Sequence, residues 1–165
     1  MLCRMAMLFC SALMFNIFTR HQVMSGVFLR IISLGDIMRK IKCFSLMFLI
    51  GGIGYNLIEI LWRGYTHVSM FFAGGICFNA FAAIGKNSKN HKPFFLAAIG
   101  ALMVTAVEFI TGCIVNLWLK KKVWDYSKMP LNILGQICPV FTLLWGLLSL
   151  FAIPFSAKIH KRLSK

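Results

Sequence analysis

Four long apolar blocks, separated by short polar segments, dominate the pattern of this chain. A membrane-spanning helix needs about 20 apolar residues, because each residue adds about 1.5 Å and the hydrocarbon core is about 30 Å thick. Four segments reach that length: Cys43 to Trp62, Thr66 to Gly85, Pro93 to Leu119 and Ile133 to Phe155. The pattern therefore predicts an all-α fold, a polytopic transmembrane bundle of four helices arranged as two helix hairpins.

Prolines, a polar cap and aromatic residues mark the expected ends of these blocks. Pro93 fits the first turn of a helix, where its missing N–H costs nothing, while Asn132 can cap the fourth block and Pro154 lies near its end. Aromatic residues gather near the loops 63–65 and 120–132, as expected of a belt at one membrane face: Trp62, Tyr65, Trp118, Trp124 and Tyr126.

The first 37 residues do not match the pattern of the rest. Met5–Thr19 is short for a span, and Val23–Gly35 is interrupted by Arg30. Met38 then opens a short basic segment that leads directly into the first block. Residues 1–37 form an extra helix or an interfacial segment, or translation begins at Met38, which the sequence favours slightly. The remaining domains are a transmembrane domain at 38–155 and a basic cytoplasmic tail at 156–165.

The composition is typical of a membrane protein. Of the 165 residues 59% are hydrophobic, the mean hydropathy is +0.80, and 18 Lys and Arg stand against 4 Asp and Glu. A soluble chain of this length needs a larger polar surface. The net charge of +14 does not indicate nucleic acid here, because the cations cluster between apolar blocks, where they face lipid headgroups. We expect the lipid bilayer, and no nucleic acid, as a partner.

The cations also predict the orientation of the bundle. If the first block runs outward, five Lys and Arg lie outside the cell: Arg63, Lys120, Lys121, Lys122 and Lys128. Ten lie inside: Arg39, Lys40, Lys42, Lys86, Lys89, Lys92, Lys158, Lys161, Arg162 and Lys165. Because cytoplasmic loops carry the excess of cations, we expect both ends of the four-helix unit in the cytoplasm.

Two glutamates, Glu59 and Glu108, lie inside these apolar blocks. A carboxylate at the centre of a membrane helix costs about 2.5 to 3.5 kcal/mol, so it normally has a partner or a function. Arg63 and His67 follow Glu59 at i+4 and i+8, roughly on one helical stripe. One interpretation is a structural ion pair at the helix end. The other is a binding or proton-accepting site shared by the two glutamates, with Arg63 as counter-charge and His67 as an external gate.

The connection from Lys120 to Cys138 is the second polar element. Asp125 and Ser127 can hydrogen-bond nearby backbone groups, and Pro130 stops a preceding helix. The connection is either a well-capped turn or a lid or docking surface, so Asp125 and Asn132 join the candidate binding residues.

Neither a metal site nor a catalytic site is indicated. The six cysteines form no CxxC pair and have no His at ligand spacing, which is typical of reduced packing residues. No block carries the paired Glu-x-x-His arrangement of di-metal bundles. Glu108 with His67 or Asp125 is the one acid–base set that can be assembled. We expect no metal, no cofactor and no enzymatic activity.

A short pattern recurs in the two predicted hairpins. Gly51 precedes Glu59 by eight residues, as Gly100 precedes Glu108, and the following blocks carry GGIC at 74–77 and GQIC at 135–138. The hairpins could be parallel copies with a site at their interface, as in many transporters. Alternatively, small residues recur by chance in membrane helices.

Two stretches of the chain resemble a known family. EILWRGYTHVSMFFAGGICF (59–78) and WDYSKMPLNILGQICPVFTLLWGLLS (124–149) are similar to the characteristic stretches of the putative ABC-transporter type IV, or CmpB-like, family of small bacterial membrane proteins. The resemblance covers about residues 38–155. It implies a multi-pass, permease-like protein of the bacterial inner membrane.

The function that these features predict is that of a transporter component. The sequence has no GxxxxGK[ST], so an ATPase subunit would be a separate chain. Four helices are few for a translocation path, which favours a homo-oligomer or a larger membrane complex. The chain is thus expected to be a permease-type component that moves or binds an unknown small solute. The alternative is a non-transporting membrane scaffold or sensor that acts through partner proteins.

Overall fold

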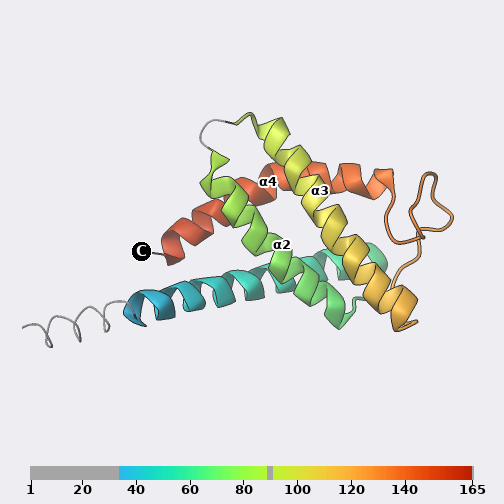
Figure 1. Cartoon of the computed structure of the whole chain (residues 1–165), viewed down its shortest axis with the longest axis horizontal. Coiled ribbons are helices and arrows are strands. Elements are labelled where there is room, and N and C mark those ends of the chain that lie inside the picture. Colours follow the sequence, from blue (N-terminus) through green and yellow to red (C-terminus); the bar gives the residue numbers. More distant parts are fainter. Residues whose placement is uncertain (1–33, 89–90, 165) are drawn as a thin grey trace, which may run out of the picture. The chain divides into compact units, whose positions relative to one another are not determined.

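The computed structural model describes residues 34–88 and 91–164, and within these ranges it is helical apart from short connections and one long loop. The elements are a first helix Leu34–Arg63, α2 Val68–Lys86, α3 Pro93–Gly112, the π-helix η2 Cys113–Trp118 and α4 Pro139–Leu163 (Figure 1). Counting η2 with α3, four helices are long and apolar enough to cross a membrane. The predicted all-α fold with four spans is confirmed. The predictions about Met5–Thr19 and about the start at Met38 concern the chain before residue 34, outside the described residues.

Local chemistry explains where these helices begin and end. Gly64 follows the first helix with a φ of +77°, a conformation that glycine adopts without steric cost. His67 precedes α2, and its side chain accepts a hydrogen bond from the Ser69 N–H, as a helix cap does. Pro93 and Pro139 occupy the first turns of α3 and α4.

The predicted bounds of the first and fourth spans were wrong. The first helix already includes Arg39 and Lys42, because long basic side chains do not interrupt a helix and can extend toward water. The fourth helix begins at Pro139 and not at Ile133, since Asn132 hydrogen-bonds within the preceding loop and caps no helix. Pro154 lies inside α4, which continues through the basic segment to Leu163.

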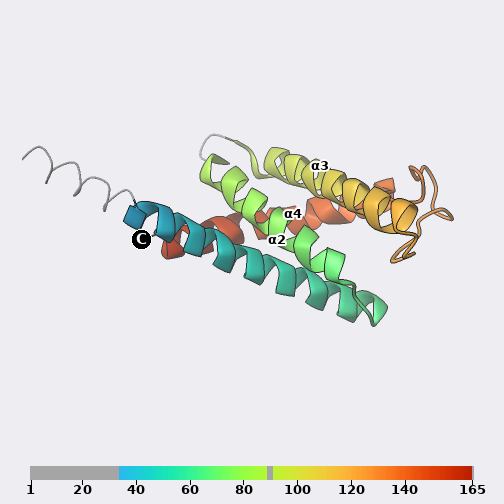
Figure 2. The same ribbon diagram turned by 60° about the horizontal axis from the view of Figure 1, so that its bottom comes forward.

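Glycines allow the first helix and α2 to approach each other closely within residues 42–165, which form one compact unit. A β-carbon on Gly51 would lie 2.5 Å from the Gly74 carbonyl oxygen, and one on Gly74 would lie 2.6 Å from that of Gly51. Gly100 of α3 approaches Ser149 of α4 in a similar way. Figure 2 shows α3 and α4 as neighbouring helices. Small residues at such crossings are typical of membrane helix pairs, which lack a hydrophobic driving force for association.

One of the two motif pairs that suggested a repeat, GGIC and GQIC, does not occupy equivalent helices, so this part of the predicted repeat is wrong. GGIC lies inside α2, but GQIC at 135–138 lies in the loop before α4, where Gly135 has a φ of +68°. The two motifs therefore occupy different kinds of structure, and their similarity does not come from equivalent helices.

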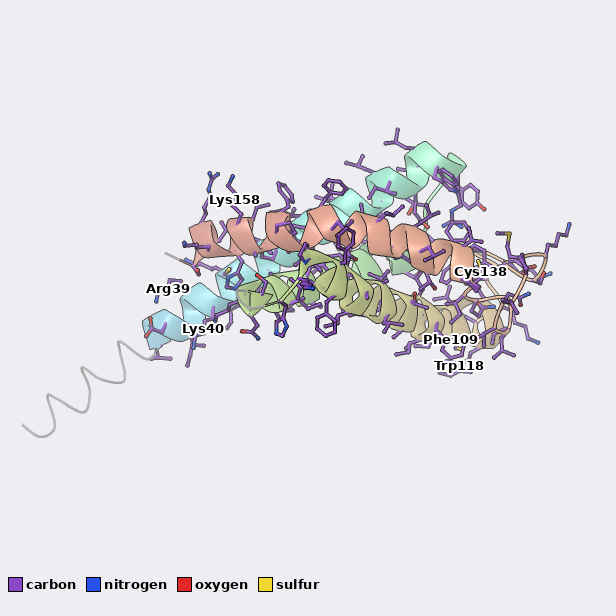
Figure 3. The ribbon with its side chains drawn as sticks, turned by 90° about the horizontal axis from the view of Figure 1, so that it is seen from above. Arg39, Lys40, Phe109, Trp118, Cys138 and Lys158 are labelled. Carbon is purple, nitrogen blue, oxygen red and sulfur yellow. The ribbon has the colours of Figure 1, made fainter. Side chains whose placement is uncertain are left out.

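The outer surface of the helices is apolar. Leu102, Leu143 and Phe151 are 67%, 72% and 74% exposed, although each lies well inside a helix. Figure 3 shows Lys158 toward one end of α4 and Cys138 at the other, with Trp118 at the Cys138 end. Large apolar patches of this kind are normally shielded from water, and lipid can shield them on helices long enough to span a bilayer.

Candidate functional site

A cavity of about 410 Å³ opens between the end of the first helix, α3, α4 and the loop after η2. Glu59, Arg63 and Glu108 all line it, as the shared-site interpretation expects. The other lining residues are mostly aromatic or aliphatic. The aromatic ones are Tyr55, Trp62, Trp124, Tyr126, Phe141 and Trp145.

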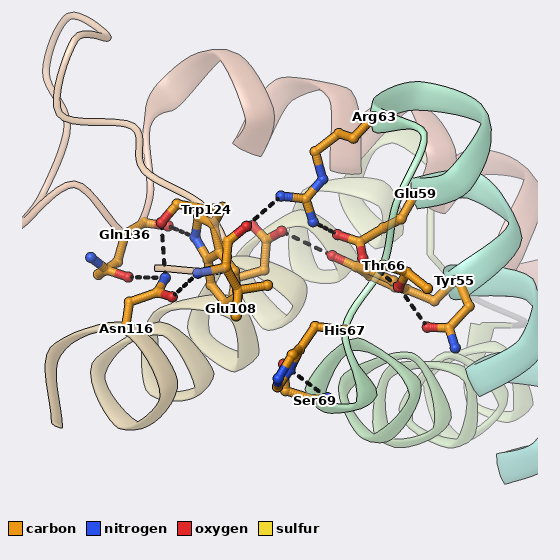
Figure 4. A network of polar contacts seen from close by, with 12 residues as sticks. Tyr55, Glu59, Arg63, Thr66, His67, Ser69, Glu108, Asn116, Trp124 and Gln136 are labelled. Atoms are coloured by element: carbon orange, nitrogen blue, oxygen red, sulfur yellow. Dashed lines mark hydrogen bonds and ion pairs between the residues drawn. The ribbon is translucent and has the colours of Figure 1, made fainter. Parts of the chain in front are cut away.

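Glu59 is neutralised within its own helix and by the following turn. Its Oε1 accepts a hydrogen bond from the Arg63 guanidinium, one helical turn away, and its Oε2 accepts one of 2.7 Å from the Thr66 hydroxyl (Figure 4). The Glu59 and Arg63 side chains are 10% and 20% exposed. At such low exposure the attraction between the two charges offsets the cost of removing them from water, and an unpaired ion would keep that full cost.

Glu108 has no such partner among the contacts of the described residues. Its Oε1 accepts a hydrogen bond of 3.0 Å from the Tyr55 hydroxyl, and its Oε2 accepts one of 2.8 Å from Trp145 Nε1. Both donors are neutral, and Glu108 is only 5% exposed. With both glutamates ionised, the cavity would hold two carboxylates and one guanidinium, and one negative charge would lack a counter-charge.

The donors also decide which oxygen of Glu108 could carry a proton. An indole N–H can only donate, so Oε2 must act as an acceptor toward Trp145. A hydroxyl can donate or accept, so a proton on Oε1 would be shared with Tyr55. Glu108 can thus be satisfied as a carboxylate, or as an acid with its proton on Oε1.

Arg63 connects this pair to the loop. Its Nη1 donates a hydrogen bond of 3.1 Å to the Val123 carbonyl. The Val123 N–H donates a hydrogen bond of 2.7 Å to Asn116 Oδ1. The side-chain nitrogen Nδ2 of Asn116 donates to Trp124 O at 3.0 Å and to Gln136 Oε1 at 2.8 Å. Trp124 Nε1 donates a hydrogen bond of 3.0 Å to the Gln136 carbonyl oxygen. The cavity wall at Trp124 is therefore fixed by buried polar contacts.

The π-helix η2 presents Asn116 to this network. Cys113–Trp118 winds with one extra residue per turn, and such segments occur often at functional sites. Asn116 is 9% exposed, and Gly112 lets Gln136 approach, since a β-carbon there would lie 2.5 Å from Gln136 Oε1.

The loop 119–138 holds several residues in the left-handed backbone region. Leu131 and Leu134 have φ values of +55° and +53°, which cost of order 1–3 kcal/mol each for side chains with a β-carbon. Asn132 lies between them, donates from Nδ2 to Met129 O at 2.8 Å, and accepts from the Gly135 N–H at 3.0 Å. Asn132 thus shapes the loop and does not line the cavity.

Two further predicted residues lie outside the cavity lining. His67 caps α2 through Nδ1. Asp125 is exposed, and its Oδ1 accepts the Ser127 N–H at 2.8 Å. This hydrogen bond lowers the pKa of Asp125 below its ordinary value. Of the six candidates, the structure brings Glu59, Arg63 and Glu108 together at the cavity.

Sequence reasoning missed several polar partners of these three residues. Tyr55 lies one turn before Glu59, and Asn116 is a polar residue inside an apolar block, so both had a signal in the sequence. Trp145 had none, because an indole in an apolar block is also typical of a lipid-facing side chain. Trp124 was assigned to the aromatic belt, but it is buried, whereas Trp62 and Trp118 are 71% and 78% exposed.

No group of three or more His, Cys, Asp or Glu side chains within residues 34–88 and 91–164 is placed to hold a metal ion. The chemistry of the cavity is that of one ion pair, one carboxylate with neutral donors, and aromatic walls.

Comparison with known protein families identifies a match. The family described as "Putative ABC-transporter type IV" matches residues 46–165, well over half of the chain. The match includes all the cavity-lining residues named above. No curated protein and no solved structure matches the chain.

Proposed function

Since this chain belongs to the putative ABC-transporter type IV family, we propose that it is the permease-type membrane component of a transporter, with its solute bound in the cavity at Glu59, Arg63 and Glu108. The family and the four span-like helices make it a multi-pass membrane protein. We place it in the bacterial inner membrane, with the loop 119–138 outside.

The buried carboxyl group of Glu108, which receives hydrogen bonds only from the neutral donors Tyr55 and Trp145, is the observation that carries this proposal. Ionisable groups inside membrane helices are expensive, and they usually mark the path of a substrate or ion. Glu108 lies ten residues before Trp118, about 15 Å from that end of the helix, and in the proposed membrane orientation this position would be well inside the bilayer. The cavity volume of about 410 Å³ lies within the range of small-molecule sites.

The energy source would be a separate ATPase subunit, because the chain carries no phosphate-binding GxxxxGK[ST] loop. The exposed cations Lys86, Lys158 and Lys161 provide a basic surface at the proposed cytoplasmic end. Four helices are few for a translocation path, so the functional unit would be a homo-oligomer or a larger complex. Neither His67 nor Asp125 lines the cavity with Glu108, so the acid–base set considered from the sequence is not assembled there.

Purification from the native host in mild detergent tests this proposal. An affinity-tagged chain should elute with a chain that contains GxxxxGK[ST], at a fixed molar ratio, and the complex should hydrolyse ATP. The Glu108→Gln variant should keep the same assembly, because the substitution changes the cavity and not the outer surface. Elution without any ATPase chain and without ATP hydrolysis would reject the transporter proposal.

A membrane scaffold or sensor is the second candidate, and the loop 119–138 is the observation that favours it. Leu131, Ile133 and Leu134 are 83%, 53% and 65% exposed at the tip of this ordered loop. Exposed apolar side chains on a rigid loop are typical of contact surfaces. This function predicts that stable partners elute with the chain, that none of them is an ATPase, and that replacing Leu131 and Leu134 by Ser releases them.

A further inference from the structure

We infer that the cavity binds a monovalent organic cation, whose charge Glu108 balances and whose apolar body lies among the aromatic walls. This inference rests on the proposed function, because it names the class of solute that the same cavity would take.

Charge balance is the first argument. Glu59, Glu108 and Arg63 are the charged side chains that line the cavity. Arg63 hydrogen-bonds to Glu59, while Glu108 receives only the neutral donors Tyr55 and Trp145. An empty cavity can be neutral only if Glu108 takes up a proton on Oε1. A ligand with a single positive charge gives the same neutrality, whereas an anion would add to the excess negative charge.

The cavity walls argue for an organic cation and against a metal ion. Ca²⁺ takes six to eight oxygen ligands, and Mg²⁺ keeps several waters in an octahedral shell. The lining here is mostly aromatic and aliphatic, with Glu59 and Glu108 as its only carboxylates. The faces of Trp and Tyr rings attract organic cations, by about 0.5 to 2 kcal/mol for each contact.

The aromatic walls are also held in place. Tyr55 stacks on Trp145 with ring centroids 5.5 Å apart, and Tyr126 stacks on Phe141 at 4.5 Å. Trp124 is fixed by its hydrogen bond to Gln136 O. A preformed wall loses little freedom on binding, which favours affinity for a rigid aromatic or quaternary ammonium group.

The surroundings of the cavity indicate that the ligand has an apolar part. The rim residues Leu61 and Trp62 are 87% and 71% exposed, on helix surfaces that lipid would cover. A second cavity of about 180 Å³ adjoins the first and shares Tyr55, Ile58, Trp145 and Leu148 with it. Its lining contains no charged side chain. The two cavities together therefore fit an amphiphile, with its cationic group at Glu108 and an apolar chain in the smaller cavity.

Three probes of nearly equal shape separate charge from shape in the purified full-length protein. Phenyltrimethylammonium is a cation, tert-butylbenzene is its neutral isostere, and benzenesulfonate is an anion of similar size. Trp62, Trp124 and Trp145 line the cavity, so tryptophan fluorescence reports binding directly, with empty micelles as the blank. We expect saturable binding of the cation, about tenfold tighter than that of either other probe, which corresponds to about 1.4 kcal/mol.

Variants then assign the charge recognition to Glu108. Glu108→Gln should weaken binding of phenyltrimethylammonium by about tenfold or more. The matched control Asp36→Asn changes an exposed carboxylate at the other end of the first helix, and it should leave the affinity unchanged. Thermal stability is measured on the same samples, so that a folded Glu108→Gln protein is verified.

Three results would overturn the inference. Equal affinity for the neutral isostere, or full affinity in a folded Glu108→Gln variant, would mean that charge is not recognised. Saturable binding of benzenesulfonate alone would contradict the inference that the ligand is a cation. It would still agree with the proposal that the cavity binds a solute. The absence of saturable binding for all three probes would also overturn it, while the co-purification experiment decides the proposed function separately.

Discussion

The indole Nε1–H of Trp145 donates a 2.8 Å hydrogen bond to Glu108, so a buried carboxyl group of α3 is held by a neutral aromatic donor from α4. Glu59 lies four residues, or about 6 Å, before the end of its helix, and it hydrogen-bonds to Arg63. The two glutamates of this bundle therefore have different chemical surroundings, and different consequences are expected when each is changed.

Removing the indole donor should destabilise the protein. Trp145→Phe keeps an aromatic ring that can stack on Tyr55, but it leaves Glu108 Oε2 without its donor. This hydrogen bond contributes about 0.5 to 1.5 kcal/mol when Glu108 is protonated and about 1.5 to 3 kcal/mol when it is a carboxylate, so the midpoint of thermal unfolding in detergent should fall by a few degrees. Trp118→Phe is the matched control, because Trp118 is 78% exposed, and it should shift the midpoint little. Similar shifts in both variants would show that the hydrogen bond to Glu108 contributes nothing specific.

A second prediction concerns the close crossing of the first helix and α2, where a larger residue at Gly51 should destabilise the protein. Gly51→Ala would place its β-carbon against Phe78 Cβ and 2.5 Å from the Gly74 carbonyl oxygen, and backbone atoms cannot move aside cheaply. We expect a loss of about 1 to 3 kcal/mol, seen as a lower thermal midpoint. Gly54→Ala, three residues along the same helix, has no neighbour within 4 Å and should not destabilise. An unchanged midpoint for Gly51→Ala would contradict the crossing.

Asn116 should control the order of the loop 119–138. Asn116→Ala removes the partners of the Val123 N–H, the Trp124 carbonyl and Gln136, each at a cost of about 1 to 3 kcal/mol if it stays buried. Trypsin should then cut the Lys120–Lys122 run several times faster in detergent. Thr111→Ala removes a hydroxyl that hydrogen-bonds only to its own helix at Val107, so it serves as the control. Equal cleavage rates in the two variants would mean that the loop does not depend on Asn116.

The orientation can be measured by cysteine labelling in a background without native cysteines. A cysteine at Ser127 should react with a membrane-impermeant maleimide added outside intact cells, because the loop 119–138 lies on the side with fewer cations. A cysteine at Ser88, in the connection between α2 and α3, should react only after the cells are opened. Outside labelling at Ser88 would invert the proposed topology.

The sequence predicted the spans because length and hydropathy alone decide whether a helix can cross a bilayer. The pairing of Glu59 with Arg63 was also predictable, since both lie on one helix at i and i+4. The polar partners of Glu108 were not, because Tyr55 and Trp145 come from other helices and their contacts depend on helix packing. The loop was misread for a related reason. The segment Ile133–Cys138 is mostly apolar and resembles the start of a span. Its Gln136 hydrogen-bonds to Asn116, and this contact, which holds the segment in a turn, has no local sequence pattern.

The thermal stabilities of Glu59→Gln and Glu108→Gln, compared in one detergent, test the central claim that Glu108 belongs to a binding site and not to a structural ion pair. Glu59→Gln leaves the Arg63 guanidinium without a counter-charge at 20% exposure, so it should lose roughly 2 to 3 kcal/mol and several degrees. Glu108→Gln should stay close to the wild type, because the amide oxygen can accept from Trp145 and the amide nitrogen can donate to the Tyr55 hydroxyl. Equal, large losses in both variants would show a purely structural network and contradict the assignment of the cavity as a site.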